Sequence, residues 1–163
     1  MRAIALCLVL TLIAVTAFAK DPAPQAAENP TKTFTSAAEV QELIGKAAAA
    51  HKPNQPLVTE PMLELGFYNG HLEYRASVGN ASVHEKEAEM FYVIDGSATL
   101  VTGGKLVNEK RTDAANLSGS AIEGGNARVI SKGDFVLVPE NTPHWFSPIS
   151  GVLVLFSMHV PRP

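Results

Sequence analysis

The feature that most constrains the fold is a series of short apolar segments that fills the chain after Leu57, separated by Gly, Asn, Asp and Pro. Segments of this length and composition are typical of β-strands. We predict strands at residues 62–68, 71–78, 90–94, 98–102, 135–138 and 152–160. So many short strands predict an all-β barrel or sandwich, because each strand has to bury at least one face against another.

The size and charge of the chain indicate one domain without a polyanionic partner. The 163 residues, 46% of them hydrophobic, suffice for one domain with a substantial core. No internal repeat is visible, which excludes two tandem barrels. The formal charge of -3 comes from 13 basic and 16 acidic residues that are spread without long runs. We therefore expect no nucleic-acid partner.

The first nineteen residues have the pattern of a secretory signal peptide. Arg2 precedes an apolar run at 3–15, and the Ala-Phe-Ala at 17–19 is typical of a cleavage site. The alternative is a membrane anchor, but the run is shorter than the ~20 residues that cross a bilayer. We predict a periplasmic or secreted protein that has no membrane contact after cleavage. Its mature chain lacks disulfides, since the only cysteine, Cys7, lies in the leader.

A linker and one helix precede the strands. Residues 20–33 are rich in Pro, Ala, Gln and Asn, which predicts a mobile linker. Within residues 34–56, Ser36 and Glu39 have the spacing of a capping box, and apolar residues follow at helical intervals. Two prolines then end the helix. The barrel is predicted to occupy residues 57–163.

Two stretches contain candidate metal ligands, and the first lies around His84. Four residues separate His84 from Glu89, and six separate Glu89 from Gly96. Side chains alternate along a strand, so Ser82 and His84 are expected to share a face. Glu89 can return to that face only if the chain bends in between, and residues 85–88 are polar enough to form the bend.

The second stretch, residues 133–144, ends at His144. Gly133, Pro139 and His144 have a spacing that, together with the first stretch, resembles the two motifs of the cupin superfamily over about residues 57–160. Asn141 replaces a motif glycine, and asparagine adopts the left-handed conformation more readily than most residues. The resemblance implies a single cupin barrel, which is a double-stranded β-helix or jelly roll. The helix predicted above precedes it.

The resemblance also implies that His84, Glu89 and His144 are metal ligands. Two imidazoles and one carboxylate suit Zn, Mn, Fe, Ni or Cu. Ser82 stands where the first motif has another histidine, so it is a possible fourth ligand or a position that holds water. In the alternative, the pocket is metal-free and these side chains only hydrogen-bond one another.

Other residues around this site receive more general predictions. The predicted pocket-lining residues are Phe91, Phe146 and Tyr74. On the strand at 71–78, we expect the polar side chains, which include Glu73 and Arg75, to face outward, and Tyr74 to face the opposite way. His159 is expected on the surface or the rim. Residues 105–123 form either a polar hairpin extension or a loop, which could act as a lid.

The cupin resemblance indicates fold and metal more readily than reaction, because the superfamily includes many activities. Our first hypothesis is an exported metalloenzyme of the lyase, isomerase or dioxygenase type that acts on a small molecule. The alternative is a non-catalytic module of the cell envelope that binds a small ligand. No residue is assigned a catalytic role. A homodimer is expected from the resemblance and from the need to protect edge strands.

Overall fold

The computed structural model describes residues 31–161. The predicted signal peptide and most of the predicted linker lie outside these residues. At the end of that linker, Lys32 exchanges backbone hydrogen bonds of 2.7 and 2.8 Å with Glu64. Within residues 31–161, the structure contains no helix that is long and apolar enough to span a membrane.

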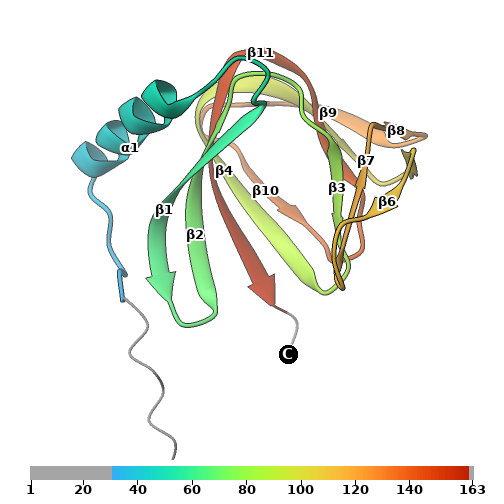
Figure 1. Cartoon of the computed structure of the whole chain (residues 1–163), viewed down its shortest axis with the longest axis horizontal. Coiled ribbons are helices and arrows are strands. Elements are labelled where there is room, and N and C mark those ends of the chain that lie inside the picture. The colour runs from blue at the N-terminus through green and yellow to red at the C-terminus, as the bar shows by residue number, and fades with distance from the viewer. Residues whose placement is uncertain (1–30, 162–163) are drawn as a thin grey trace, which may run out of the picture.

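One helix is followed by eleven strands in the described part of the chain (Figure 1). The elements are α1 (Ala37–Ala50), β1 (Leu57–Leu65), β2 (Tyr68–Arg75), β3 (Ala81–His84), β4 (Glu87–Thr102), β5 (Lys105–Val107), β6 (Lys110–Arg111), β7 (Asn116–Gly119), β8 (Ala121–Glu123), β9 (Asn126–Ser131), β10 (Phe135–Val138) and β11 (His144–Pro161).

The strands form a curled antiparallel sheet around one interior. One path through the sheet runs β1-β2-β11-β3-β7-β6, and β4 pairs with β9, β10 and β11. The two longest strands, β4 and β11, pair with each other along most of their lengths (Figure 1). This arrangement confirms the predicted all-β jelly-roll barrel with an N-terminal helix.

Several strand boundaries differ from the sequence prediction. The predicted strand at 62–68 crosses the turn between β1 and β2. A further difference arises because Gly96 is not a turn. The predicted strands at 90–94 and 98–102 are halves of the single strand β4. Gly96 has a φ of +82°, and a Cβ at this position would lie 2.0 Å from the carbonyl oxygen of Val152. The strand therefore bends at Gly96 without ending. Similarly, β11 begins at His144, well before the predicted strand at 152–160.

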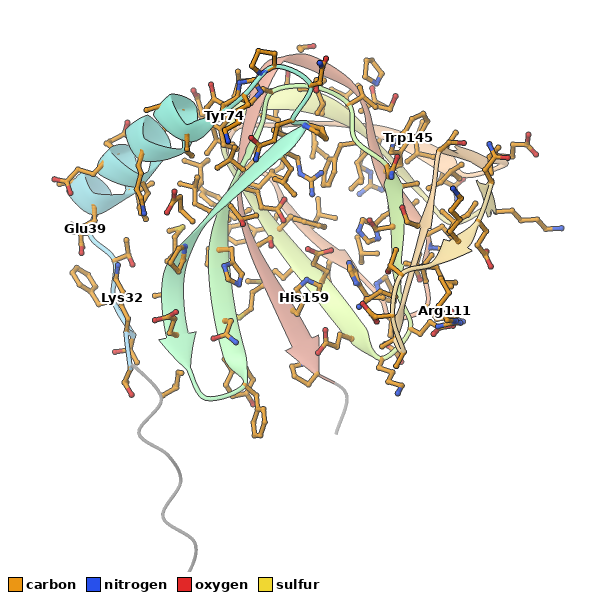
Figure 2. All side chains as sticks on the ribbon, viewed as in Figure 1. Lys32, Glu39, Tyr74, Arg111, Trp145 and His159 are labelled. Atoms are coloured by element: carbon orange, nitrogen blue, oxygen red, sulfur yellow. The ribbon has the colours of Figure 1, made fainter. Side chains whose placement is uncertain are left out.

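The helix covers the outer face of the sheet. Its predicted capping box is present, with Glu39 N–H donating to Ser36 Oγ at 3.2 Å and Ser36 N–H donating to Glu39 Oε2 at 2.7 Å. Ala47 is buried in an outer core that includes Leu72 and Val154. Tyr74 packs on this outer core beside α1 (Figure 2), so its predicted place in the pocket is wrong.

Glu73 and Arg75 face the barrel interior, which corrects the prediction that they point outward. Glu73 is paired with Leu155 and Arg75 with Leu153, and both leucines belong to the inner core. The sequence pattern separated the two faces of β2 correctly, but the prediction assigned the wrong face to the barrel interior. The strand is buried on both sides, and α1 requires the apolar set on the outer face. The inner core is built from Phe91, Val93, Ala98, Leu100, Ile130, Val138, Phe146, Leu153 and Leu155.

The polar segment at 105–123 is a folded extension of the barrel. β5 pairs with β8 in a separate two-stranded sheet, and β7 pairs with β3 residue by residue, from Ala81 with Gly119 to His84 with Asn116. Of the two forms predicted for this segment, the structure has the hairpin extension. The pairing of His84 with Asn116 brings the extension directly to the candidate metal ligands.

Candidate metal centre

Two turns bring the two cupin-like motifs together. β3 ends at His84, the chain bends at residues 85–86, and β4 starts at Glu87. Asn141 has a φ of 55°, as its left-handed preference predicts. Its N–H donates to the carbonyl oxygen of His84 at 2.7 Å. This hydrogen bond therefore holds the turn before His144 against the end of β3, the strand that provides His84.

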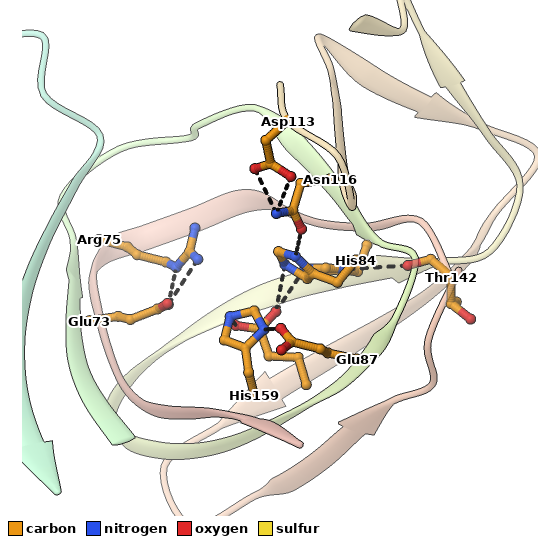
Figure 3. Close-up of polar contacts among 10 residues, drawn as sticks. Glu73, Arg75, His84, Glu87, Asp113, Asn116, Thr142 and His159 are labelled. Atoms are coloured by element: carbon orange, nitrogen blue, oxygen red, sulfur yellow. Dashed lines mark hydrogen bonds and ion pairs between the residues drawn. The ribbon is translucent and has the colours of Figure 1, made fainter. Parts of the chain in front are cut away.

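The two predicted histidine ligands, His84 and His144, meet at the carboxylate of the third ligand, Glu89. The Nε2 atom of His84 lies 3.3 Å from Glu89 Oε2, and the Nε2 atom of His144 lies 3.1 Å from the same oxygen. Glu89 and His144 are buried. These residues come from β3, β4 and β11, and Figure 3 shows His84 among the polar contacts around this site.

His159 joins this cluster, which the sequence did not predict. Its Nε2 atom lies 3.5 Å from Glu89 Oε1, and its ring stands edge-on to the His84 ring with 4.5 Å between centroids. The donor atoms of His84, Glu89 and His159 all lie within 4.8 Å of one another. His159 is at the rim, as expected, with a side chain that is 33% exposed, but it faces inward.

The Nδ1 atom of each of two imidazoles has an acceptor. His84 Nδ1 lies 2.6 Å from Asn116 Oδ1, and the amide nitrogen of Asn116 donates to both oxygens of Asp113 at 2.9 and 2.8 Å (Figure 3). His144 Nδ1 lies 3.3 Å from the carbonyl oxygen of Thr142. Since both acceptors are oxygens, this network assigns the proton to Nδ1 and directs Nε2 at Glu89.

The same contacts determine the charge state of the cluster. Burial alone would raise the pKa of Glu89, but hydrogen bonds from His144 and His84 outweigh it, and the pKa lies well below its usual range. Burial alone would lower the pKa of His84, whereas the hydrogen bonds with Glu89 and Asn116 raise it overall. Glu89 is thus a carboxylate at neutral pH, which is the form that binds metal.

The donor set and its spacing fit a divalent transition metal. Bonds of about 2.1 Å place neighbouring donors about 3.0 Å apart in an octahedron and about 3.4 Å apart in a tetrahedron. The contacts of the histidines with Glu89 measure 3.1, 3.3 and 3.5 Å. Neutral Nε2 atoms and a carboxylate repel each other at this distance unless a proton or a cation lies between them. A metal and a set of protonated imidazoles therefore remain the two readings of the cluster.

Two predicted pocket residues lie next to the cluster in the barrel interior. The ring of Phe91 lies 6.0 Å from that of His144 and makes an edge contact of 5.1 Å with Phe146. The guanidinium carbon of Arg75 lies 4.6 Å from the centre of the Phe146 ring. Ser82 is paired with His144 across β3 and β11, so it borders the site.

Sequence reasoning also missed Asn116 and Asp113. They lie in the polar extension, where Asn116 is paired with His84 across two strands. No motif spacing indicates this contact, because it depends on how the extension folds back onto β3. The hydrogen bonds from Asn116 and from the Ala115 N–H lower the pKa of Asp113. Asp113 is therefore an ionised acceptor that orients the Asn116 amide.

We predict that replacing Asn116 by Leu weakens metal binding by about 10- to 100-fold, the usual cost of losing a partner that orients a ligand histidine. The leucine retains the approximate size of the side chain but offers His84 Nδ1 no acceptor. Chelator competition with Zn²⁺ measures the change. Thr112→Val is a matched control. It removes a hydrogen bond to the backbone carbonyl oxygen of Asn116 but leaves the contact between the Asn116 side chain and His84 intact. Equal affinities of the two variants would contradict the orienting role.

Comparisons with known proteins support the fold. No family model matches the chain, and no curated protein matches it by sequence. Among solved structures, the BH2720 protein of Bacillus halodurans has a TM-score of 0.52 at 12% identity, covering 81% of this chain and 83% of that chain.

Two further structures are KdgF from a Halomonas species and TT1209 from Thermus thermophilus. KdgF has a TM-score of 0.49 at 15% identity, covering 69% of this chain and 87% of its own. TT1209 has a TM-score of 0.49 at 15% identity, covering 70% and 91%. The barrel architecture and the similarity to BH2720 show that the chain has a cupin-like fold.

Proposed function

We propose that this protein binds one divalent transition metal ion through His84, Glu89 and His144 and acts as a metalloenzyme on a small molecule. The observation that supports the proposal most directly is the direction of two imidazoles. The Nδ1 atoms of His84 and His144 have oxygen acceptors, and their Nε2 atoms converge on Glu89 Oε2. A preorganised donor set of this kind is what a metal site requires.

The protein would supply the charge and the surroundings of the ion. Glu89 provides a buried negative charge, and the neighbouring Phe91 and Phe146 limit the access of water from the barrel interior. A bound divalent ion would act as a Lewis acid toward an oxygen of the small molecule. Zn, Mn, Fe, Ni and Cu all suit the donors, so the reaction class stays open among lyase, isomerase and dioxygenase.

A second candidate function is a non-catalytic module that binds a small ligand. It is favoured by two carboxylates near the site that are each paired with an arginine. Such pairing makes a carboxylate less suited to acid or base catalysis. Glu73 is paired with Arg75 at 2.8 Å, and Glu85 accepts two hydrogen bonds from Arg111 at 2.7 and 2.9 Å. Export, a cell-envelope location and a homodimer are further parts of the proposal that rest on the sequence.

Elemental analysis of the purified mature protein tests metal binding. We expect about one equivalent of a transition metal, either as isolated or after reconstitution with Zn, Mn, Fe, Ni or Cu. The control variant is His51→Ala, which removes a histidine at the end of α1 whose ring lies beside Tyr74, outside the cluster. The control should retain the metal. If wild-type protein holds none after reconstitution with all five ions, the metal-free reading is correct.

A further inference from the structure

We infer that His159 is a fourth protein ligand of this centre, supplied by β11 in place of the histidine that Ser82 replaces in the first motif. The inference rests on the proposed function, since it concerns the same ion. It changes the donor set from two imidazoles and one carboxylate to three imidazoles and one carboxylate. Nothing in the two motif spacings indicates this residue.

The register of the barrel places His159 beside Glu89. The two residues are directly paired across β11 and β4. Paired residues on neighbouring antiparallel strands project to the same face of the sheet. Further along the same two strands, Ser157 pairs with Phe91 and Leu155 pairs with Val93, and all four of these residues are buried. His159 therefore continues the inward face of β11 to the rim.

The distances around His159 are those of a shared donor set. Its Nε2 atom lies 3.5 Å from Glu89 Oε1, whereas His84 and His144 contact Oε2. The three imidazoles thus contact both oxygens of one carboxylate. The edge-on packing of the His159 and His84 rings, with centroids 4.5 Å apart, brings their donor atoms close together.

The other ring nitrogen of His159 faces the carboxylate of Glu87. Its Nδ1 atom is buried and lies 3.1 Å from Glu87 Oε2 in an ion pair, without a hydrogen bond. A buried nitrogen without a hydrogen bond is uncommon. Binding of an ion through Nε2 accounts for the inward ring and leaves an Nδ1 proton facing the Glu87 carboxylate.

The inference also separates the roles of His159 and Ser82 at the centre. Ser82 is paired with His144, and His159 is paired with Glu89, so the two positions lie at different places around the cluster. Four protein donors leave two positions of an octahedron for other ligands. Ser82 lies beside His144 and would present a hydroxyl group next to a small molecule bound at those positions.

The test compares the affinities of five mature proteins for Zn²⁺ and Co²⁺ by chelator competition: wild type, His159→Ala, Ser82→His, the double variant of these two, and the control His51→Ala. We expect His159→Ala to lose more than about 100-fold, because even residues that orient a ligand contribute 10- to 100-fold. The visible spectrum of bound Co²⁺ should change as well. The double variant should recover part of the loss, and His51→Ala should match wild type.

Zinc X-ray absorption of the wild-type protein gives an answer that does not depend on variant folding. Three imidazoles around the ion support the inference, and two overturn it. Wild-type affinity and an unchanged Co²⁺ spectrum in His159→Ala also overturn it, while the proposed metal function stands. If wild-type protein binds neither ion, the proposed function and this inference both fail.

Discussion

Replacement of Glu89 by Gln is expected to remove metal binding almost completely and to change the pH dependence of stability. Glutamine has nearly the same shape as glutamate but no charge, and Glu89 is the one carboxylate that all three histidines contact. We expect the Zn²⁺ affinity to fall by more than about 100-fold, beyond the cost of losing an orienting partner. Glu42→Gln, on the exposed side of α1, is the control for an equal change of charge.

The pH dependence of the metal-free protein follows from the two pKa shifts. The pKa of Glu89 is lowered, so its contribution to stability is present above the ordinary carboxyl pKa of about 4.3 and is lost as the pH falls through the lowered value. The pKa of His84 is raised, so its contribution is present below about 6.5 and is lost as the pH rises through the raised value. In the window between about 4.3 and 6.5, both contributions are present.

Metal binding has the opposite pH dependence above this window, because an imidazole has to lose its Nε2 proton before it can bind an ion. We therefore expect Zn²⁺ affinity to rise with pH while the stability of the metal-free protein falls. Urea unfolding with chelator, and Zn²⁺ competition over the same pH range, measure both trends. Glu89→Gln should flatten the first trend. If it leaves Zn²⁺ affinity at the wild-type value, Glu89 is not a ligand.

The sequence predicted the local parts of this centre and missed the parts that depend on strand register. The spacing of His84, Glu89 and His144, the bend between the first two and the left-handed turn at Asn141 are all local features, and each is present in the structure. His159 was placed at the rim without a role. Its neighbour across the sheet depends on how β11 pairs with a strand that bends at Gly96.

The faces of β2 were assigned incorrectly for a related reason. Alternation along a strand separates two sets of side chains but does not say which set faces the barrel. The inward position of Glu73 and Arg75 was unexpected because charged residues seldom enter a core without a partner. Here they are each other's partner, and α1 covers the apolar set that includes Leu72 and Tyr74.

The substitution Arg75→Met, which breaks this pair, is expected to destabilise the barrel strongly. The side chains of Arg75 and Glu73 are only 15% and 8% exposed, and both Nε and Nη2 of Arg75 lie 2.8 Å from Glu73 Oε2. Methionine preserves much of the packing on Phe146 but removes the charge, leaving the Glu73 carboxylate buried and unpaired. We expect a loss of about 3–5 kcal/mol in the free energy of unfolding.

Two comparisons separate the lost charge pair from lost packing. Replacing both residues, as in Glu73→Leu/Arg75→Met, should recover most of the stability, because two apolar side chains need no charge partner. Arg111→Met breaks the exposed pair with Glu85 and should have a much smaller effect. Urea unfolding of the metal-free proteins measures all three. If the double variant is as unstable as Arg75→Met, the charge pair is not the cause of the loss. The packing of Arg75 on Phe146 then stabilises this part of the interior. Phe146 contacts Phe91, which in turn contacts His144.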